Sequence, residues 1–299
     1  MTDLIPQIPL AAWIDAALSF TTTLLSPLTR AVSGVLSTGI RGMVDGLVFI
    51  PPWLFVIIAA AAAWKIAGRK VAILAALGML LIWNLGLWRP MISTLSLVLI
   101  STLIAVAIGL PLGILAALND RFFSFIRPIL DFMQTLPAFV YLIPAIPFFG
   151  LGAVSAIMST VIFSIPPAIR LTTLGIRQID AELIEASDAF GSTTMQKLIK
   201  VQIPIATPTI MAGVNQTIML SLSMVVIAAM IGAGGLGGEV WRAIQRLRAG
   251  AGFEAGIAVV ILAMILDRIT QKIGAGRQRS VVTGDADEKS DDTSETDAA

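Results

Sequence analysis

Residues 180–204 read DAELIEASDAFGSTTMQKLIKVQIP, a charged and ordered segment in a chain that is otherwise largely apolar. Asp180 has the position of an N-cap for a helix that reaches Phe190. Glu182 lies in the first turn of this helix, where a carboxylate is favoured by the helix dipole. Gly191 follows directly, and glycine is the residue that most readily takes the positive φ of a helix-ending turn. The segment therefore begins with a short helix that ends at a glycine turn.

A second helix is predicted after this turn. Thr193 and Gln196 have the spacing of a capping box, in which each side chain bonds the backbone of the other residue. The residues that follow carry an apolar face of helical period, and Pro204 is expected to end the helix as the next apolar stretch begins. Residues 175–205 thus form a loop that contains two amphipathic helices.

Outside this loop, the chain is apolar enough to require a membrane. Hydrophobic residues make up 57% of the 299 residues and charged residues only 13%, and the mean hydropathy is +0.90. A membrane-spanning helix needs about 20 apolar residues. We predict an all-α polytopic membrane protein with about seven spans, preceded by one or two amphipathic helices. The spans are expected at 47–67, 71–88, 91–118, 129–150, 152–174, 206–231 and 254–273.

Missing residue types exclude several kinds of site. The chain has no cysteine and no histidine, so it lacks thiolate ligands, a thiol nucleophile and the commonest general base. It carries no Walker sequence for ATP and no basic run interleaved with aromatic residues. We therefore predict no catalytic residue, no metal site and no nucleic-acid partner.

The basic residues predict an orientation. Most of the 20 Lys and Arg residues fall on the inner side if the first span enters from outside. This places the N-terminus outside and the C-terminus in the cytoplasm. Arg242, Arg246 and Arg248 then lie outside, against the usual bias, on a helix after the glycine-rich turn at 232–238. That helix is a candidate outer gate or docking surface for an acidic partner.

The N-terminal segment is amphipathic. Polar side chains recur every three or four positions over residues 10–41, with an interruption near Pro27. We expect one or two helices that lie along the outer membrane surface, or that pack on the bundle with their polar stripe toward solvent. The chain then divides into four parts: an N-terminal extracytoplasmic segment (1–46), the first two spans (47–90), a core that contains the loop (91–274) and a disordered acidic tail (275–299).

The spacing within the 175–205 loop gives a specific resemblance. The cytoplasmic coupling motif of bacterial ATP-binding cassette (ABC) importer permeases is Glu-Ala-Ala, three residues, Gly, nine residues and Ile-x-Leu-Pro. This chain is similar at every spacing, with Glu185, Ala186, Ser187, Gly191, Val201, Ile203 and Pro204. Ser187, Val201 and Ile203 are conservative departures. The resemblance implies the permease fold, with this loop docked in a groove of a separate ATP-binding subunit.

A narrower likeness covers about residues 90–273. Phrases in this region resemble the glycine betaine/proline (quaternary-amine) uptake permeases, namely those at 131–141, 166–172, 211–217, 222–228 and 234–237. The resemblance implies an osmoprotective importer in the cell inner membrane that works as a homodimer with an extracytoplasmic substrate-binding protein. ATP and Mg would be held by the partner subunit, and no cofactor by this chain. Glycine betaine, proline betaine, choline, carnitine and proline all stay open as substrates.

A few residues are candidates for the solute pathway. A quaternary ammonium ion is recognised through aromatic faces, which suggests Phe139 and Tyr141. Asn215 and Gln216 lie inside the sixth predicted span, where an amide either faces the pathway or bonds a neighbouring helix. Met224, which lies in the segment 222–228, is the last candidate for the solute pathway.

Two other functions fit the apolar bulk of the chain. An ion-coupled secondary carrier needs acidic residues inside its spans, and Asp131 and Asp267 are the only near candidates. It would leave the 175–205 loop unexplained. A membrane-embedded hydrolase would lack histidine, cysteine and paired carboxylates. The ABC permease is therefore the predicted function.

Overall fold

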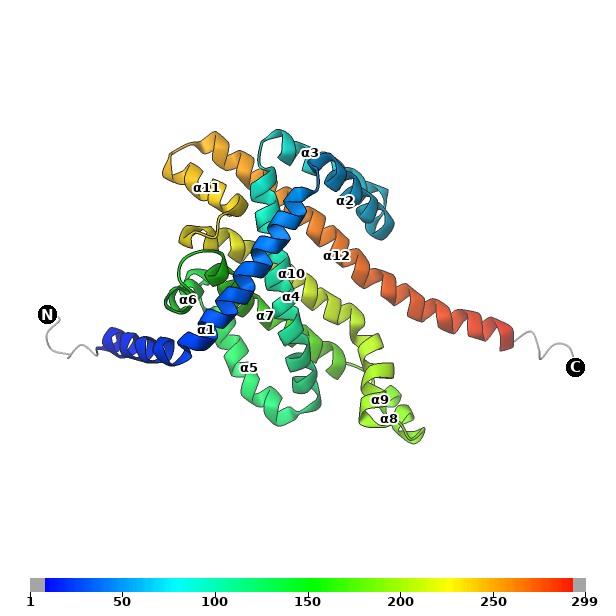
Figure 1. Ribbon diagram of the computed structural model, residues 1–299. Helices are drawn as coiled ribbons and strands as arrows, with labels where there is room; N and C mark the ends of the chain where they lie inside the picture. The colour runs from blue at the N-terminus through cyan, green and yellow to red at the C-terminus, as the bar shows by residue number, and fades with distance from the viewer. Residues whose placement is uncertain (1–8, 293–299) are drawn as a thin grey trace, which may run out of the picture.

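Four long helices form the centre of the molecule (Figure 1). The computed structural model describes residues 9–292, with side chains from residue 9 to residue 273, and this part contains helices but no strand. The central helices are α4 (Trp88–Leu118), α7 (Ala153–Arg177), α10 (Ile203–Ala228) and α12 (Ala249–Asp292). The all-α prediction is confirmed.

Small residues let α4 and α7 pack closely and in parallel. A Cβ atom at Gly109 would lie 2.7 Å from the Cβ of Ala168, and one at Gly113 would lie 2.6 Å from the Cβ of Thr172. The Thr173 hydroxyl donates a hydrogen bond to the Gly113 carbonyl at 3.0 Å. Glycines four residues apart allow two membrane helices to approach in this way.

The remaining contacts fix the direction of each helix. The helix α7 leads directly into the 175–205 loop, so its C-terminal end marks what we call the inner side. The helix α10 returns antiparallel to α7, since the Ser221 hydroxyl donates to the Ser164 hydroxyl at 3.1 Å. At the opposite, outer side, α11 (Gly235–Gln245) joins α4 through a hydrogen bond of 2.8 Å from the Leu236 N–H to the Thr94 hydroxyl.

The first two predicted stretches form a short hairpin. The helices α2 (Pro52–Ala67) and α3 (Arg69–Asn84) have 16 residues each and meet at Gly68, which has a φ of +90°. A span usually has about 17 to 25 residues, so both helices are at or below the lower end of that range. The hairpin packs beside α12 (Figure 1).

The predicted span at 129–150 is broken rather than straight. It corresponds to α5 (Asp120–Thr135), the short helix η1 (Ala138–Tyr141) and α6 (Leu142–Phe149), with a bend of 112°. Leu136 has an extended backbone with a ψ of 133° because it precedes Pro137, and a residue before proline avoids the helical conformation. The single-span expectation for 129–150 is corrected accordingly.

The N-terminal amphipathic segment is one helix, α1 (Leu10–Phe49), with Pro27 inside it. By length and composition, five helices of the described part can cross a membrane, α1 among them, or six if the bent pair counts as one. However, α1 runs across the bundle (Figure 1), and Asp45 near its end shares a cavity with Arg89 of α4 and Glu239 of α11. These contacts involve the C-terminal end of α1, and the helix also packs against α6 and α7.

Without α1, the seven predicted stretches follow the order of the helices. Six of them each match one helix, namely α2, α3, α4, α7, α10 and α12, and the stretch at 129–150 matches α5 together with α6. The last helix differs from its prediction in length. It continues to Asp292, whereas the sequence predicts a disordered tail over 275–299. Residues 293–299 of that tail lie outside the described residues.

Candidate functional site

The 175–205 loop contains the two predicted helices. The first, α8 (Ala181–Ala189), begins after Asp180, although the Asp180 side chain makes no capping hydrogen bond. Gly191 has a φ of +75°, a conformation that a residue with a Cβ atom adopts only at a cost. The predicted glycine turn is therefore confirmed.

The second helix, α9 (Thr194–Lys197), has the predicted capping box. The Gln196 N–H donates to the Thr193 hydroxyl at 3.3 Å, and the Thr193 N–H donates to the Gln196 side-chain oxygen at 2.9 Å. Both donors are backbone N–H groups at the start of the helix, where the helix itself provides no acceptor for them.

Pro204 does not end this helix, contrary to the prediction. The helix continues through the π-helical turn η2 (Leu198–Gln202) and then as α10, in which Pro204 lies in the first turn. A proline lacks the N–H group of the helical ladder and its ring clashes with the carbonyl four residues earlier. A wider π turn before the proline relieves this conflict. The loop is thereby joined to α10 without a break.

An ion pair that the sequence did not reveal fastens the two loop helices to each other. The Lys197 ammonium lies 2.7 Å and 2.8 Å from the two carboxylate oxygens of Asp188 on α8. The two residues are nine positions apart and on different helices, so no helical spacing signals their contact.

The motif residues separate into exposed and buried groups. Glu185, Ala186 and Gly191 are exposed. Ser187 is buried, and its hydroxyl has no hydrogen-bond partner among the described residues. Val201 and Ile203 are half-buried, and Ile203 packs on a small cluster formed by Ile176, Leu198 and Ala206. This cluster holds the loop against the inner ends of α7 and α10.

The tip of the loop presents large apolar side chains to the surroundings. Phe190 has 90% of its surface exposed, and Leu183, Met195 and Ile199 are also exposed. An exposed apolar cluster beside polar residues is typical of a protein-protein contact surface. The loop is therefore a projection of two linked helices with an exposed apolar tip.

Comparison with known proteins identifies the chain. Residues 109–276 match the family model of the binding-protein-dependent transport system inner membrane component. The chain belongs to this family of ABC importer permeases. The matched region contains the whole 175–205 loop, the last ten residues of α4, all of α7 and α10, and α12 up to residue 276.

Several relatives resemble this permease over most of their length. The glycine betaine transport system permease protein OpuAB of Bacillus subtilis is 53% identical, over 91% of this chain and 96% of its own. The glycine betaine/carnitine transport permease protein GbuB of Listeria monocytogenes is 53% identical, over 89% of this chain and 96% of its own. The glycine betaine/proline betaine transport system permease protein ProW of Escherichia coli is 45% identical, over 93% and 80%.

A solved structure has the same fold. The permease resembles a chain of the MetNI methionine ABC transporter in an inward-facing conformation, with a TM-score of 0.60 and 25% identity, over 64% of this chain and 95% of the other. The predicted ABC permease fold is thereby confirmed.

Two of the predicted pathway residues are buried inside the protomer. Met224 has no exposed surface and lies in the main core. Tyr141 is also buried; its hydroxyl donates to the Met133 carbonyl, and its ring packs edge-on against Phe163 with the centroids 5.5 Å apart. In this structure neither side chain faces an open path.

The other three candidates have different surroundings. Phe139 and Gln216 are exposed. The Asn215 amide donates to the Asp267 carboxylate at 2.9 Å, which realises the predicted bond between helices. The carboxylate of Asp131 is also engaged, by Arg170 of α7. Both acidic candidates of the ion-coupled alternative thus have protein partners.

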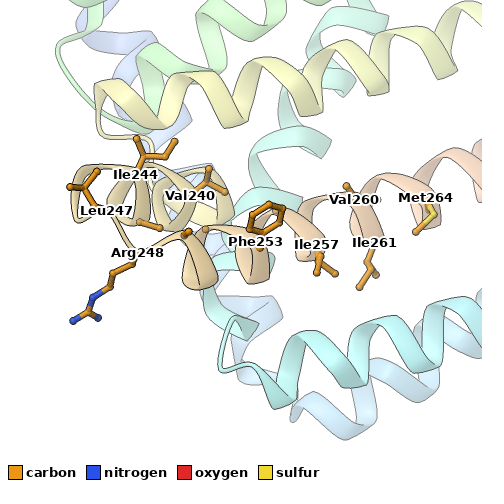
Figure 2. A pocket seen from close by; sticks show the side chains of 13 residues that line it. Val240, Ile244, Leu247, Arg248, Phe253, Ile257, Val260, Ile261 and Met264 are labelled. Atoms are coloured by element: carbon orange, nitrogen blue, oxygen red, sulfur yellow. The ribbon is translucent and has the colours of Figure 1, made fainter.

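An apolar groove with a volume of about 800 Å³ lies between α11 and α12 (Figure 2). Phe253, Ile257 and Met264 line one wall, and the charged end of Arg248 points away from the groove (Figure 2). A hydrated polar solute needs polar partners that this lining does not provide. The groove is therefore not a candidate solute site.

Proposed function

We propose that this permease imports glycine betaine and related quaternary-amine compatible solutes for osmoprotection, driven by ATP hydrolysis in a separate subunit. The names of the relatives OpuAB, GbuB and ProW support the substrate class. The geometry of the 175–205 loop, with its exposed tip at Phe190, is the observation that carries the coupling to a partner ATPase.

The loop is suited to transmit a rigid-body movement to two spans at once. Its first helix follows α7 after a few residues, and its second helix is continuous with α10 through η2. The Lys197–Asp188 ion pair and the capping box keep the two loop helices together. Closure of two ATP-binding subunits would therefore displace α7 and α10 as a unit, which is how a packed interface converts a local push into a domain movement.

The assembly that we propose is a homodimer of this permease with two ATP-binding subunits and an extracytoplasmic binding protein. The N-terminus and α1 lie outside, and the loop and the C-terminus lie in the cytoplasm of a cell bounded by this inner membrane. The outer surface around α11 carries Arg89, Arg242, Arg246 and Arg248 beside Asp45 and Glu239. These charges favour docking of a binding protein with complementary lobes.

The test is transport by the reconstituted complex. The permease, its ATP-binding subunit and its binding protein are placed in liposomes, and uptake of radiolabelled glycine betaine is measured with and without internal ATP. We expect uptake only with ATP and only with the binding protein. Uptake that persists without ATP would instead indicate the ion-coupled carrier, and an imposed sodium or proton gradient would then drive it.

A further inference from the structure

The helix α5 has three distinct faces. Ile126 and Leu130 are buried against the bundle. A second face is apolar but exposed. A third face is polar and exposed, and its residues follow one another at intervals of four, three, four and three positions, so they form one stripe along the helix. The exposed apolar face contains Phe125, Ile129 and Phe132, and the polar stripe contains Asp120, Ser124, Arg127, Asp131 and Gln134.

The bilayer allows only one of the two exposed faces to meet lipid. The helix α5 starts beside the inner end of α4 and forms, with η1 and α6, an apolar pair that is bent by 112°. Charged side chains in such a segment are expensive in hydrocarbon and face the protein interior or a water-filled cavity. The face with Phe125, Ile129 and Phe132 suits an apolar environment. The polar stripe is therefore expected to face a water-filled cavity or a second copy of this chain rather than lipid.

An arginine from another helix reaches the middle of this stripe. Arg170 of α7 forms an ion pair with Asp131, and the two side chains keep 38% and 54% of their surface exposed. The Nε atom of Arg170 is buried and has no partner among the described side chains, so one guanidinium donor is left over. A second link, 2.7 Å between Arg177 and Asp120, holds the inner end of α5 to α7. The pair at Asp131 thus offers one positive and one negative group, side by side, along the stripe.

We propose that the polar stripe of α5, with the Asp131–Arg170 pair at its middle, forms the inner-half wall of the solute pathway and takes a small zwitterion as its ligand. This inference rests on the proposed function. A solute with a carboxylate and a quaternary ammonium group has the same two charges as the pair. Its carboxylate accepts from the Arg170 guanidinium, and its ammonium lies beside the Asp131 carboxylate. When no solute is present, the two side chains close on each other, so neither of these two charges is left unpaired.

The absence of cysteine from the chain makes a direct test available. Single variants are built in pairs at matched depth, with Ser124→Cys and Gln134→Cys on the polar stripe, and Phe125→Cys and Phe132→Cys on the apolar face. Each is assembled with the ATP-binding subunit and the binding protein. Inside-out membrane vesicles that hold the binding protein and glycine betaine in their lumen are treated with a membrane-impermeant cationic methanethiosulfonate, and both labelling and ATP-driven release of glycine betaine are measured.

We expect the cysteines of the polar stripe to react about a hundredfold faster than their matched controls, because a permanently charged reagent enters lipid poorly. Modification at residue 134 should also block release, and excess glycine betaine during turnover should slow that reaction but not the one at residue 132. Equal labelling of both faces, or faster labelling of the apolar face, would overturn the proposal. The two stripe positions lie at different depths, so a folding defect in one variant leaves the other informative.

The outcomes also separate this inference from the proposed function. If the unmodified complex imports glycine betaine but the stripe cysteines do not react, the pathway wall is wrong and the function stands. If the stripe reacts selectively but no quaternary amine is imported or protects, the substrate class and the zwitterionic ligand are both wrong. Only selective labelling with protection supports both.

Discussion

Phe190 and Phe49 form a natural pair for testing the docking tip. The two side chains are almost equally exposed, at 90% and 89%, but Phe190 lies at the tip of the inner loop and Phe49 at the outer end of α1. Burying a phenylalanine in an interface contributes about 1.5–3 kcal/mol. We expect Phe190→Asp to weaken binding of the ATP-binding subunit by about tenfold or more. Phe49→Asp should leave that binding unchanged.

The measurement is titration of the purified ATP-binding subunit onto each detergent-solubilised variant. The comparison removes the general effect of placing an aspartate on an exposed site. If both variants bound the subunit as the unmodified permease does, the tip would not be the docking surface, and the exposed apolar cluster of the loop would need another partner.

At this scale, local chemistry was predictable and long-range pairing was not. Gly191 and the Thr193–Gln196 capping box were found from the sequence because each depends on a few neighbouring residues. The Lys197–Asp188 ion pair needs the folded turn to bring its partners together, so no spacing announces it. The buried state of Met224 likewise depends on the helices around it, and its place in the segment 222–228 alone suggested a pathway role.

Among the helices, the contact between α4 and α7 is sensitive to side-chain size. A Cβ atom at Gly113 would lie 2.6 Å from the Cβ of Thr172 and 2.8 Å from the Ile169 carbonyl oxygen, so backbone and side chain both resist it. Overpacking of this kind costs about 1–3 kcal/mol. We expect Gly113→Ala to lower the thermal unfolding midpoint of the detergent-solubilised permease by several degrees.

The matched control for that substitution is Gly42→Ala, in α1, where a Cβ atom meets nothing within 4 Å. A helical glycine in open surroundings gains rather than loses helix stability on becoming alanine. If Gly113→Ala unfolded at the same temperature as Gly42→Ala, the two helices would have room to separate, and the close parallel packing would not be required.

The signal for this packing was present in the sequence and unused. Gly109 and Gly113 have the four-residue spacing that favours close helix pairs in membranes, but the stretch was interpreted only as a long span. Prolines were harder to interpret. Pro137 does break a helix, whereas Pro204 is accommodated by the π turn at η2, and only the surrounding packing decides between these outcomes.

For the whole molecule, the hydrophobic stretches gave the order of the apolar helices because that information is one-dimensional. Their number is not settled in the same way, since five helices of the described part, or six with the bent pair, are long and apolar enough to cross a membrane. Where α1 lies was not decided by hydropathy, since this helix is long and apolar enough to cross a membrane and is nevertheless mostly exposed. Its position follows from contacts with residues of α4, α6 and α11 that are far away in the chain. Length and composition alone would have counted it as a further span.

The resulting topology can be tested with introduced cysteines in an otherwise cysteine-free chain. Asp15→Cys reports on α1, Gln245→Cys on the outer end of α11, and Ser192→Cys on the turn of the inner loop. In intact cells, a membrane-impermeant maleimide should label residues 15 and 245 but not 192, and in inside-out vesicles the pattern should reverse. The reason is that the C-terminal end of α1 lies beside the outer ends of α4 and α11 and we propose that the rest of α1 stays on that side, whereas α7 carries the loop to the other side. Labelling of residue 15 together with residue 192 would mean that α1 crosses the membrane, which would add a span and move the N-terminus to the cytoplasm. Residue 245 serves as the internal control, since its side is set by α4 and α10 in either case.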